Sequence, residues 1–345
     1  MRKLLLIGLA SLFLVGCSKV DKIDRKIQID FNNEYYQVAS PYKPSVSGSY
    51  VVNNVLNNYD INDVENSYMM LSSNYFKTTN SLYQAGQYFS RGDLQELLSK
   101  DNLNKEEIVQ INGVELTPTY VSSIYEQNYL TNNGHLKGLT IGLIINPYQS
   151  YLTDLGNYDY EEVPIATLEP IIIEKAKSVI KYIRTNPKLK EVRVVIGVYL
   201  QNRPNAMLPG GIKYVGVTTD ESITLSKINY EYQYLNSNYV LTNDINIYNA
   251  FSNLEKQIKK IKESINVSAK GLYQNNKLQN IEITVHSGTF NSGELLYLSN
   301  TISNEMDNFD SQLTIQVVVK SNNSVLAFIN KGSNSLKSKV YILGG

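Results

Sequence analysis

The chain has 345 residues, which is enough for one large domain or two medium ones that bury a core without crosslinks. It carries 32 basic and 32 acidic residues, and this neutral balance argues against a nucleic-acid binder, which needs a concentrated basic surface. Cys17 is the single cysteine, so the body that follows has no possible internal disulfide and depends on packing for its stability.

Residues 1–17 have the pattern of a secretory leader. A short cationic start at 1–3 is followed by an apolar run over 4–15, which is broken only by Gly8 and Ser11. This run is too short to be a comfortable permanent membrane span. The leader ends in Leu14-Val15-Gly16-Cys17, which is the pattern of a bacterial lipobox.

A lipobox predicts both a covalent anchor and a location. The thiol of Cys17 would take a diacylglycerol before the peptide bond after Gly16 is cut, and two or more acyl chains anchor a protein stably. The body is then expected outside the cytoplasm, held on the cell membrane by its N-terminal lipid. The alternative is an ordinary secretory leader with an incidental cysteine, which the absence of any other cysteine disfavours.

A tether is expected over residues 18–45. It begins with mixed charges and ends near Ser40-Pro41-Tyr42-Lys43-Pro44, where prolines favour extended backbone. The alternating stretch 27–31 predicts a short strand within it. Beyond the tether we expect two α+β domains, an N-terminal one over 46–240 and a C-terminal one over 241–345.

Apolar periodicity predicts mixed helices and strands in the N-terminal domain. A helical and turn region is expected over 53–76, and Ser90 begins a short helix, so Arg91-Gly92-Asp93 is interpreted as a helix start and not as an adhesion ligand. Thr117-Pro118 predicts another helix, with one face formed by Val121, Ile124, Tyr125 and Asn128. The other predicted elements are a strand at 139–145, a helix at 170–184, and strands at 192–200 and 212–218.

The C-terminal domain has the clearest pattern. One helix is predicted by an apolar stripe and a possible cap at Asn243 or Asp244; the stripe is Ile247, Phe251, Leu254, Ile258, Ile261 and Ile265. A second helix starts at Asn291, with Glu294 completing a capping box. Hairpins are predicted at 267–286, turning near Asn275-Asn276, and at 313–329, and an edge strand at 339–343.

These elements predict an α+β fold of mainly antiparallel sheets with helices packed on one face. The order helix, strand, strand occurs twice in the C-terminal domain. Residues 170–218 have the same order and form a possible earlier copy, although no residues match between the copies.

The sequence contains no constellation that predicts catalysis, a metal site or a cofactor. His135 and His286 lie far apart, and neither has a ligand partner at helical spacing. No nucleophile elbow and no phosphate-binding glycine loop occurs. The acidic run at 159–162 is typical of a solvated loop, although two carboxylates at the right spacing can serve a glycosidase. We therefore expect no enzyme, no cofactor and no metal.

Two surface features remain as candidates for binding. Four lysines between 256 and 262 make one helix face basic, which suits anionic lipid, but a solvated helix face is the simpler interpretation. The loop 201–211 joins two predicted central strands, and such connections often carry binding groups. Its Arg203 offers a planar donor fork for a carboxylate or phosphate, so Arg203 is the candidate ligand-binding residue; an ordered structural turn is the alternative.

The chain resembles the CamS family of sex-pheromone lipoproteins of low-GC Gram-positive bacteria. The resemblance lies in four ordered segments that lead into the Arg203 loop and Pro209-Gly210, namely Tyr83-Gln84-Ala85-Gly86-Gln87-Tyr88, Ile124-Tyr125-Glu126-Gln127-Asn128-Tyr129-Leu130, Gly138-Leu139-Thr140-Ile141-Gly142-Leu143 and Val195-Ile196-Gly197-Val198. It implies an acylated surface protein whose leader can be trimmed to a short hydrophobic pheromone. The family has no established enzymatic role, so it implies no catalytic residues.

The resemblance makes the end of the leader the candidate pheromone, which consists of Leu9, Ala10, Ser11, Leu12, Phe13, Leu14, Val15 and Gly16. Its expected partner is a receptor on a recipient cell, while the body meets the membrane through its lipid and binds no nucleic acid. The alternative function is a lipoprotein that binds a ligand or an envelope partner outside the cytoplasm and has no pheromone activity.

Overall fold

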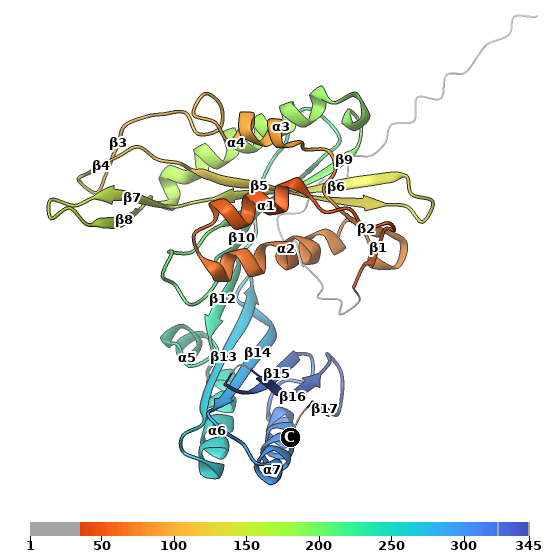
Figure 1. Ribbon diagram of the computed structural model, residues 1–345, viewed down its shortest axis with the longest axis vertical. Helices are drawn as coiled ribbons and strands as arrows, with labels where there is room; N and C mark the ends of the chain where they lie inside the picture. Colours follow the sequence, from red (N-terminus) through yellow and green to blue (C-terminus); the bar gives the residue numbers. More distant parts are fainter. Residues whose placement is uncertain (1–34, 323, 344–345) are drawn as a thin grey trace, which may run out of the picture.

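The computed structural model describes residues 35–322 and 324–343. The leader, Cys17 and the strand expected at 27–31 lie outside the described residues. Two units of α+β structure follow one another along the chain, a broad upper unit and a narrower lower one (Figure 1). A seven-stranded sheet forms the upper unit and a six-stranded sheet the lower one, which confirms the α+β class with mostly antiparallel pairing.

The upper unit places helices on both faces of its sheet. Its helices are α1 (Val46–Asn54), α2 (Asn58–Ser73), α3 (Arg91–Leu97) and α4 (Ile165–Thr185), with short 3-10 turns at Thr78–Asn80 and Pro187–Leu189. The sheet runs in the order β1-β2-β5-β6-β9-β10-β11, formed by Gln37–Val38, Leu82–Ala85, Val121–Leu130, Leu136–Ile145, Arg193–Leu200, Gly211–Thr218 and Ser226–Lys227. Two hairpins lie apart from it, β3 (Val109–Ile111) with β4 (Val114–Leu116) and β7 (Tyr148–Leu152) with β8 (Tyr158–Glu162).

The helix expected from Thr117-Pro118 is wrong, because this stretch forms the central strand β5. All ten residues of β5 are buried, since α1 packs on one face and the core beneath α3 and α4 lies on the other. A strand buried on both faces does not alternate between apolar and polar residues. The helical spacing of the apolar residues in β5 therefore arose by chance.

The strands expected at 139–145, 192–200 and 212–218 are confirmed as β6, β9 and β10. The strands β6 and β9 run parallel, and α4 is the crossover between them, as a parallel pair requires. This helix begins at Ile165, ahead of the expected start at Pro170, which lies inside it.

The lower unit keeps its helices on one face of its sheet, as expected. Its helices are α5 (Asn238–Asn243), α6 (Ile245–Ile261) and α7 (Ser292–Glu305), with a 3-10 turn at Met306–Asn308. The sheet runs in chain order from β12 to β17, formed by Tyr230–Tyr234, Asn266–Gln274, Lys277–Ser287, Thr314–Ser321, Ser324–Lys331 and Lys339–Ile342. Its strands β14 and β15 are parallel and the other neighbours antiparallel.

Local signals in the lower unit behave as the sequence predicts. Asp244 caps α6 by accepting from the N–H of Ile247, and the Asn291–Glu294 capping box begins α7. Asn275 and Asn276 turn the β13–β14 hairpin with φ angles of 49° and 64°, the left-handed backbone of a tight hairpin turn. The apolar stripe packs into one buried core with α7 and the sheet.

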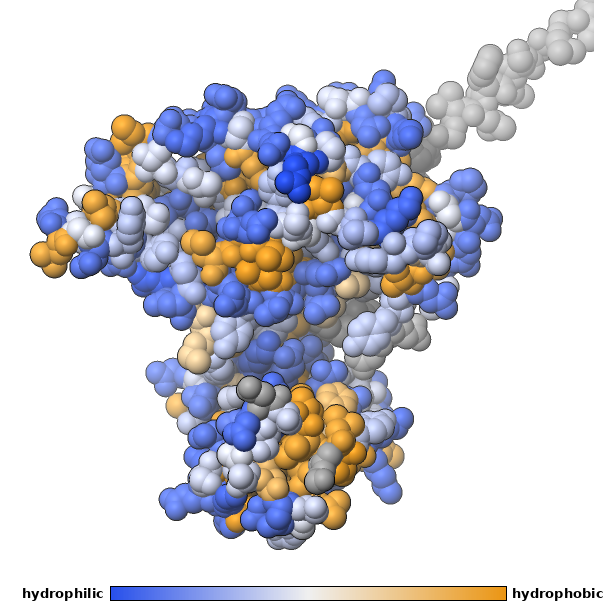
Figure 2. Space-filling model, viewed as in Figure 1, coloured by the Kyte–Doolittle hydropathy of each residue, from blue (hydrophilic) through white to orange (hydrophobic). Residues whose placement is uncertain are grey.

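The two units meet through packed side chains. β12 belongs to the second sheet although it precedes the boundary expected at 240. Tyr230, Tyr232 and Leu272 of the lower unit join the buried cluster formed by α2 and the upper sheet. The waist between the units is mostly hydrophilic in Figure 2, whereas apolar side chains gather on the lower unit, where Val340, Tyr341 and Ile342 of the edge strand are exposed.

Candidate functional site

The loop 201–210 is held against the start of α2 by two side chains. Asn57, the N-cap of α2, donates from Nδ2 to two carbonyl oxygens of the loop at 2.7 and 3.0 Å. Asp60, in the first turn of α2, accepts from the backbone N–H of Asn202 at 2.9 Å and of Gly210 at 2.6 Å. These four hydrogen bonds make the loop an ordered turn that is fixed to the neighbouring helix.

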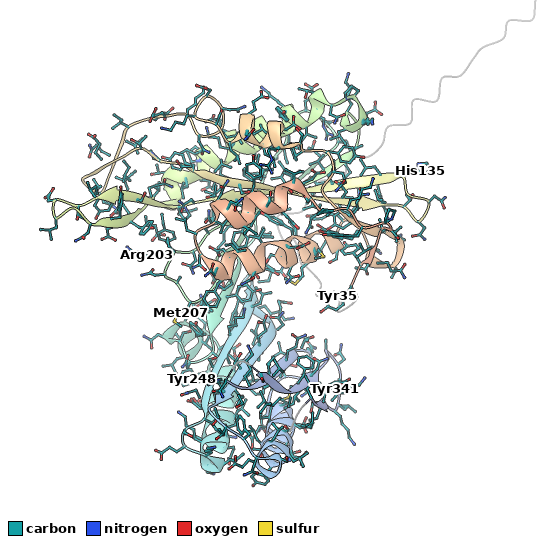
Figure 3. All side chains as sticks on the ribbon, viewed as in Figure 1. Tyr35, His135, Arg203, Met207, Tyr248 and Tyr341 are labelled. Carbon is teal, nitrogen blue, oxygen red and sulfur yellow. The ribbon has the colours of Figure 1, made fainter. Side chains whose placement is uncertain are left out.

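Arg203 lies on the outer side of this loop, at the edge of the molecule in Figure 3. Its Nη2 donates to Asp159 Oδ1 at 3.2 Å and to the carbonyl oxygen of Tyr160 at 3.1 Å, both on β8. The side chains of this ion pair are 45% and 55% exposed, so water weakens the attraction and the pair contributes about 0–1 kcal/mol. Arg203 lines neither of the two cavities described below, and ligand contact by it stays a prediction.

Two buried carboxyl groups of α2 form the centre of the junction between the units. The hydroxyl of Tyr199 on β9 lies 3.0 Å from Asp60 Oδ1 and 3.1 Å from Asp63 Oδ2. Asp63 also accepts from Ser67 Oγ at 2.7 Å and from the hydroxyl of Tyr232 at 2.8 Å. Because Tyr232 belongs to β12, its hydrogen bond joins the lower unit to α2.

Burial changes the acidity of this pair. Burial raises the pKa of Asp60 to about 6, although hydrogen bonds from Gly210 and Asn202 oppose the rise. Burial also raises the pKa of Asp63, against its hydrogen bonds from Ser67 and the tyrosines. The hydroxyl of Tyr199 has one proton and donates to one carboxylate at a time, so its second contact is a hydrogen bond only when that carboxyl group is protonated.

A cleft of about 420 Å³ opens beside this pair, between α2 and the sheet of the lower unit. From the upper side it is lined by Tyr59, Asp63 and Met70, and from the lower side by Tyr232, Lys270 and Asn280, among others. Tyr35, which also lines it, lies below α2 on the open side of the waist in Figure 3. The volume falls within the range of about 300–1,000 Å³ that is usual for small-molecule sites.

A second cavity of about 600 Å³ lies where β10 and β12 approach the start of α4. An ion pair between Lys213 and Glu231, with a separation of 3.1 Å, crosses from the upper sheet to β12 within it. Both side chains are about a quarter exposed, at 26% and 25%. This pair therefore fastens the units together and occupies two of the charged groups that line the cavity.

The two histidines are not brought together. His135 is exposed in the turn after β5, at the edge of the upper unit (Figure 3), whereas His286 lies on β14 of the lower unit. Within residues 35–322 and 324–343, no three His, Cys, Asp or Glu side chains come close enough to hold a metal ion. None of the helices in this part of the chain is long and apolar enough to cross a bilayer.

Glycines in two of the segments that carry the family resemblance make room for a helix. A Cβ on Gly142 of β6 would lie 2.2 Å from the ring of Tyr68, and a Cβ on Gly197 of β9 would lie 2.8 Å from it. Glu126 of β5, from a third segment, is buried and accepts from three consecutive backbone N–H groups at 87–89. These segments thus build the upper unit and do not line the cleft.

The sequence patterns did not predict the residues at the junction. Arg203 was the only candidate residue that they predicted near it. Asp60 and Asp63 carry the one available signal, since two acids three positions apart lie on one side of a helix. Their partners Tyr199 and Tyr232 are separated from them by 136 to 169 positions. No local pattern predicts a contact over such a distance.

Comparisons with known proteins agree with the resemblance. The family described as CamS sex pheromone cAM373 precursor matches residues 42–337. A sex pheromone precursor from Lactobacillus salivarius subsp. salivarius has the same fold, with a TM-score of 0.82 at 20% identity over 91% of this chain and 97% of that chain. The C-terminal domain of the sex pheromone staph-cAM373 precursor from Staphylococcus aureus gives a TM-score of 0.73 at 19% identity, over 85% of this chain and 99% of that chain.

No curated protein sequence matches this chain. At about one-fifth identity the structural neighbours establish the fold alone, but the family match extends over most of the sequence. The family is described as a pheromone precursor and not as a class of enzyme. The chain therefore belongs to the CamS sex pheromone cAM373 precursor family.

Proposed function

We propose that this chain is a lipid-anchored precursor on the outer side of the cell membrane, whose leader is processed to the peptide Leu9–Gly16. The observation that carries the proposal is the lipobox at 14–17 in a chain whose body belongs to a pheromone-precursor family. The leader lies outside the described residues, so its sequence and the family support the proposal together.

The chemistry of the lipobox sets the order of events. The sulfur of Cys17 displaces the headgroup of a phospholipid at its glycerol carbon and forms a thioether to the diacylglycerol. The peptide bond between Gly16 and Cys17 is then hydrolysed, which leaves the lipid on the body and gives the leader a new C-terminus. A second hydrolysis within the membrane, between Gly8 and Leu9, frees the peptide from the rest of the leader. The body stays on the membrane, because two acyl chains hold where a single one is marginal.

The released peptide suits a diffusible signal. Residues 9–16 contain no charged side chain, so the peptide can travel along or through a membrane. Their apolar side chains can fill a receptor pocket, and the terminal charges can set the orientation there. Ser11 carries the only side-chain hydroxyl, which makes it the candidate for a specific hydrogen bond.

A synthetic Leu9–Gly16 peptide tests this function in a plasmid-transfer assay with recipient cells. We expect nanomolar peptide to increase transfer, and Ser11→Ala to weaken it roughly fivefold through the loss of a hydrogen bond of about 1 kcal/mol. A peptide with the same residues in reverse order serves as the control. An equal response to the forward and reversed peptides, or no response to either, would contradict pheromone activity.

A further inference from the structure

The cleft at the waist has two walls of different origin. One wall is the exposed side of α2, with Tyr59, Asn66 and Met70, and the other is the face of the lower sheet that its own helices leave open. On this face Lys270, Glu282 and Gln316 form a row across β13, β14 and β15, because they are register partners. The cleft therefore exists only where the two units are packed together.

Each charged group that lines the cleft already has a partner. Lys270 Nζ lies 3.1 Å from Glu282 Oε2 and 4.7 Å from the centre of the Tyr232 ring. Asp63 is surrounded by three hydroxyl groups, those of Ser67, Tyr199 and Tyr232. A charged ligand would have to displace one of these pairs, so the lining favours an uncharged one.

Three of the four amide groups that line the cleft have atoms without a protein partner among the described residues; the fourth, Asn62, donates to the carbonyl oxygen of Asn58 at 2.9 Å. Asn280 Oδ1 is buried and accepts no hydrogen bond, although it lines the cleft. The side-chain amides of Asn66 and Gln316 also form no hydrogen bond within residues 35–322 and 324–343. An amide both donates and accepts, so these three side chains suit a ligand with hydroxyl groups. The closed-off oxygen of Asn280 costs about 1–3 kcal/mol until its side chain turns to meet such a group.

The rest of the lining offers rings and thioethers. Tyr35 and Tyr59 present exposed rings at the rim, whereas the Tyr232 ring is buried with Lys270 over its face; Met69 and Met70 line the wall formed by α2. The C–H face of a sugar ring packs on such aromatic surfaces while its hydroxyls reach amide groups at the edge. Methionine adapts its shape to an irregular neighbour more easily than a branched side chain does.

An extended peptide is a poorer match to this cleft. Peptides usually bind a sheet by adding a strand to a free edge. The lining residues Lys270, Asn280 and Gln316 stand on β13, β14 and β15, and each of these strands is hydrogen-bonded on both sides. A ligand in this cleft must therefore be recognised by the side chains that line it. Such recognition favours a ligand with many hydroxyl groups over a peptide backbone.

We propose that the cleft between α2 and the open face of β12–β15 binds an uncharged, polyhydroxylated ligand of the size of a short saccharide. This site is independent of the leader, so failure of the proposal leaves the precursor function untouched. Failure of the pheromone assay likewise leaves the cleft untouched.

Calorimetric titration of the full chain tests the site directly. The protein is kept in a polyoxyethylene detergent, which has no sugar headgroup, and the probes are N,N′-diacetylchitobiose, maltose and tetra-alanine. We expect one of the two saccharides to bind at micromolar to millimolar concentration and the peptide not to bind. Absence of binding by both saccharides at millimolar concentration, or binding of the peptide alone, would overturn the proposal.

Matched variants locate the binding. Asn280→Ala is expected to weaken the saccharide at least tenfold, whereas Asn128→Ala, which removes a buried and unpartnered amide oxygen on β5, away from the cleft, leaves it unchanged. Tyr59→Ala removes a half-exposed ring at the rim and should also weaken binding, with the exposed Tyr297→Ala on α7 as its control. Binding that survives in both cleft variants, or falls in either control, would place the saccharide elsewhere and contradict the proposal.

Discussion

Tyr68 of α2 packs its ring against the backbone of Gly142 on β6, where no other residue type fits. Tyr68 is fully buried, and its hydroxyl donates to the carbonyl oxygen of Gly197 at 3.2 Å. The ring also stacks on Tyr125 with its centre 6.1 Å away. This contact sets the position of α2, and α2 in turn holds the loop 201–210 and forms one wall of the cleft.

Gly142→Ala should therefore destabilise the chain. The added Cβ would lie 2.2 Å from the Tyr68 ring, which cannot move without opening the core, and overpacking of this kind costs about 1–3 kcal/mol. The control is Gly288→Ala, where the added carbon meets nothing within 4 Å and a change within about 0.5 kcal/mol is expected. Urea unfolding measures both, and equal stabilities would show that Tyr68 does not depend on this glycine.

The buried carboxyl pair should make stability fall as the pH rises. Burial raises the pKa of Asp60 from 3.8 to about 6, so the folded chain binds more protons than the unfolded chain between these values. The free energy of unfolding then decreases through this window, by roughly 3 kcal/mol for a shift of about two pKa units. Asp63, whose pKa burial also raises, contributes with the same sign.

The Asp60→Asn variant removes this titration. Its stability is expected to be lower at pH 5, because the new amide hydrogens meet the N–H of Asn202, but it should change less between pH 4 and pH 7. The exposed Asp101→Asn is the control and should keep the slope of the parent protein. Urea unfolding across this pH range decides the matter, and an unchanged slope in Asp60→Asn would contradict the assignment.

The core of the lower unit depends on the apolar side of α6. Ile258 is fully buried between α6 and the sheet, so Ile258→Ala removes packed methyl groups and should cost about 2–5 kcal/mol. Lys256→Ala on the exposed side of the same helix is the matched control and should stay within about 0.5 kcal/mol. Equal shifts of the melting temperature in the two variants would show that the apolar stripe is not part of the core.

The lower unit was predictable because its signals are local. Asn275-Asn276 specifies its own turn, Asn291 and Glu294 cap each other, and an apolar stripe defines the buried side of α6. Each of these signals lies within a few residues of the structure that it forms. Tertiary contacts reinforced them and did not overrule them.

The upper unit and the junction were harder to predict because their causes are long-range. The strand β5 is buried between two helix layers, so its residues carry no alternation that marks a strand. Asp60 and Tyr199 meet only because α2 packs across β9, and Gly142 is recognisable as a packing glycine only beside Tyr68. The resemblance to the family indicated the order of these segments along the chain, but not the contacts between them.

Cys17→Ser tests the proposed anchor. The hydroxyl of serine is a far poorer nucleophile than a thiolate, so the thioether to the diacylglycerol should not form. Cells that express either chain are fed a fatty-acid analogue, and the label is expected on the parent protein and not on the variant. The label is the deciding readout, because the uncleaved apolar leader can still hold the variant at the membrane; a label on the variant would contradict acylation at this position.

Mass spectrometry of the culture medium tests the precursor account most directly. Cells that produce the parent chain should release Leu9–Gly16, or a form of it trimmed at either end. The cut before Cys17 makes Gly16 the C-terminus before any trimming. Cells that produce Cys17→Ser should release much less, since cleavage follows lipid attachment. Absence of the fragment from the medium of the parent strain, with the body intact on the membrane, would contradict the central claim.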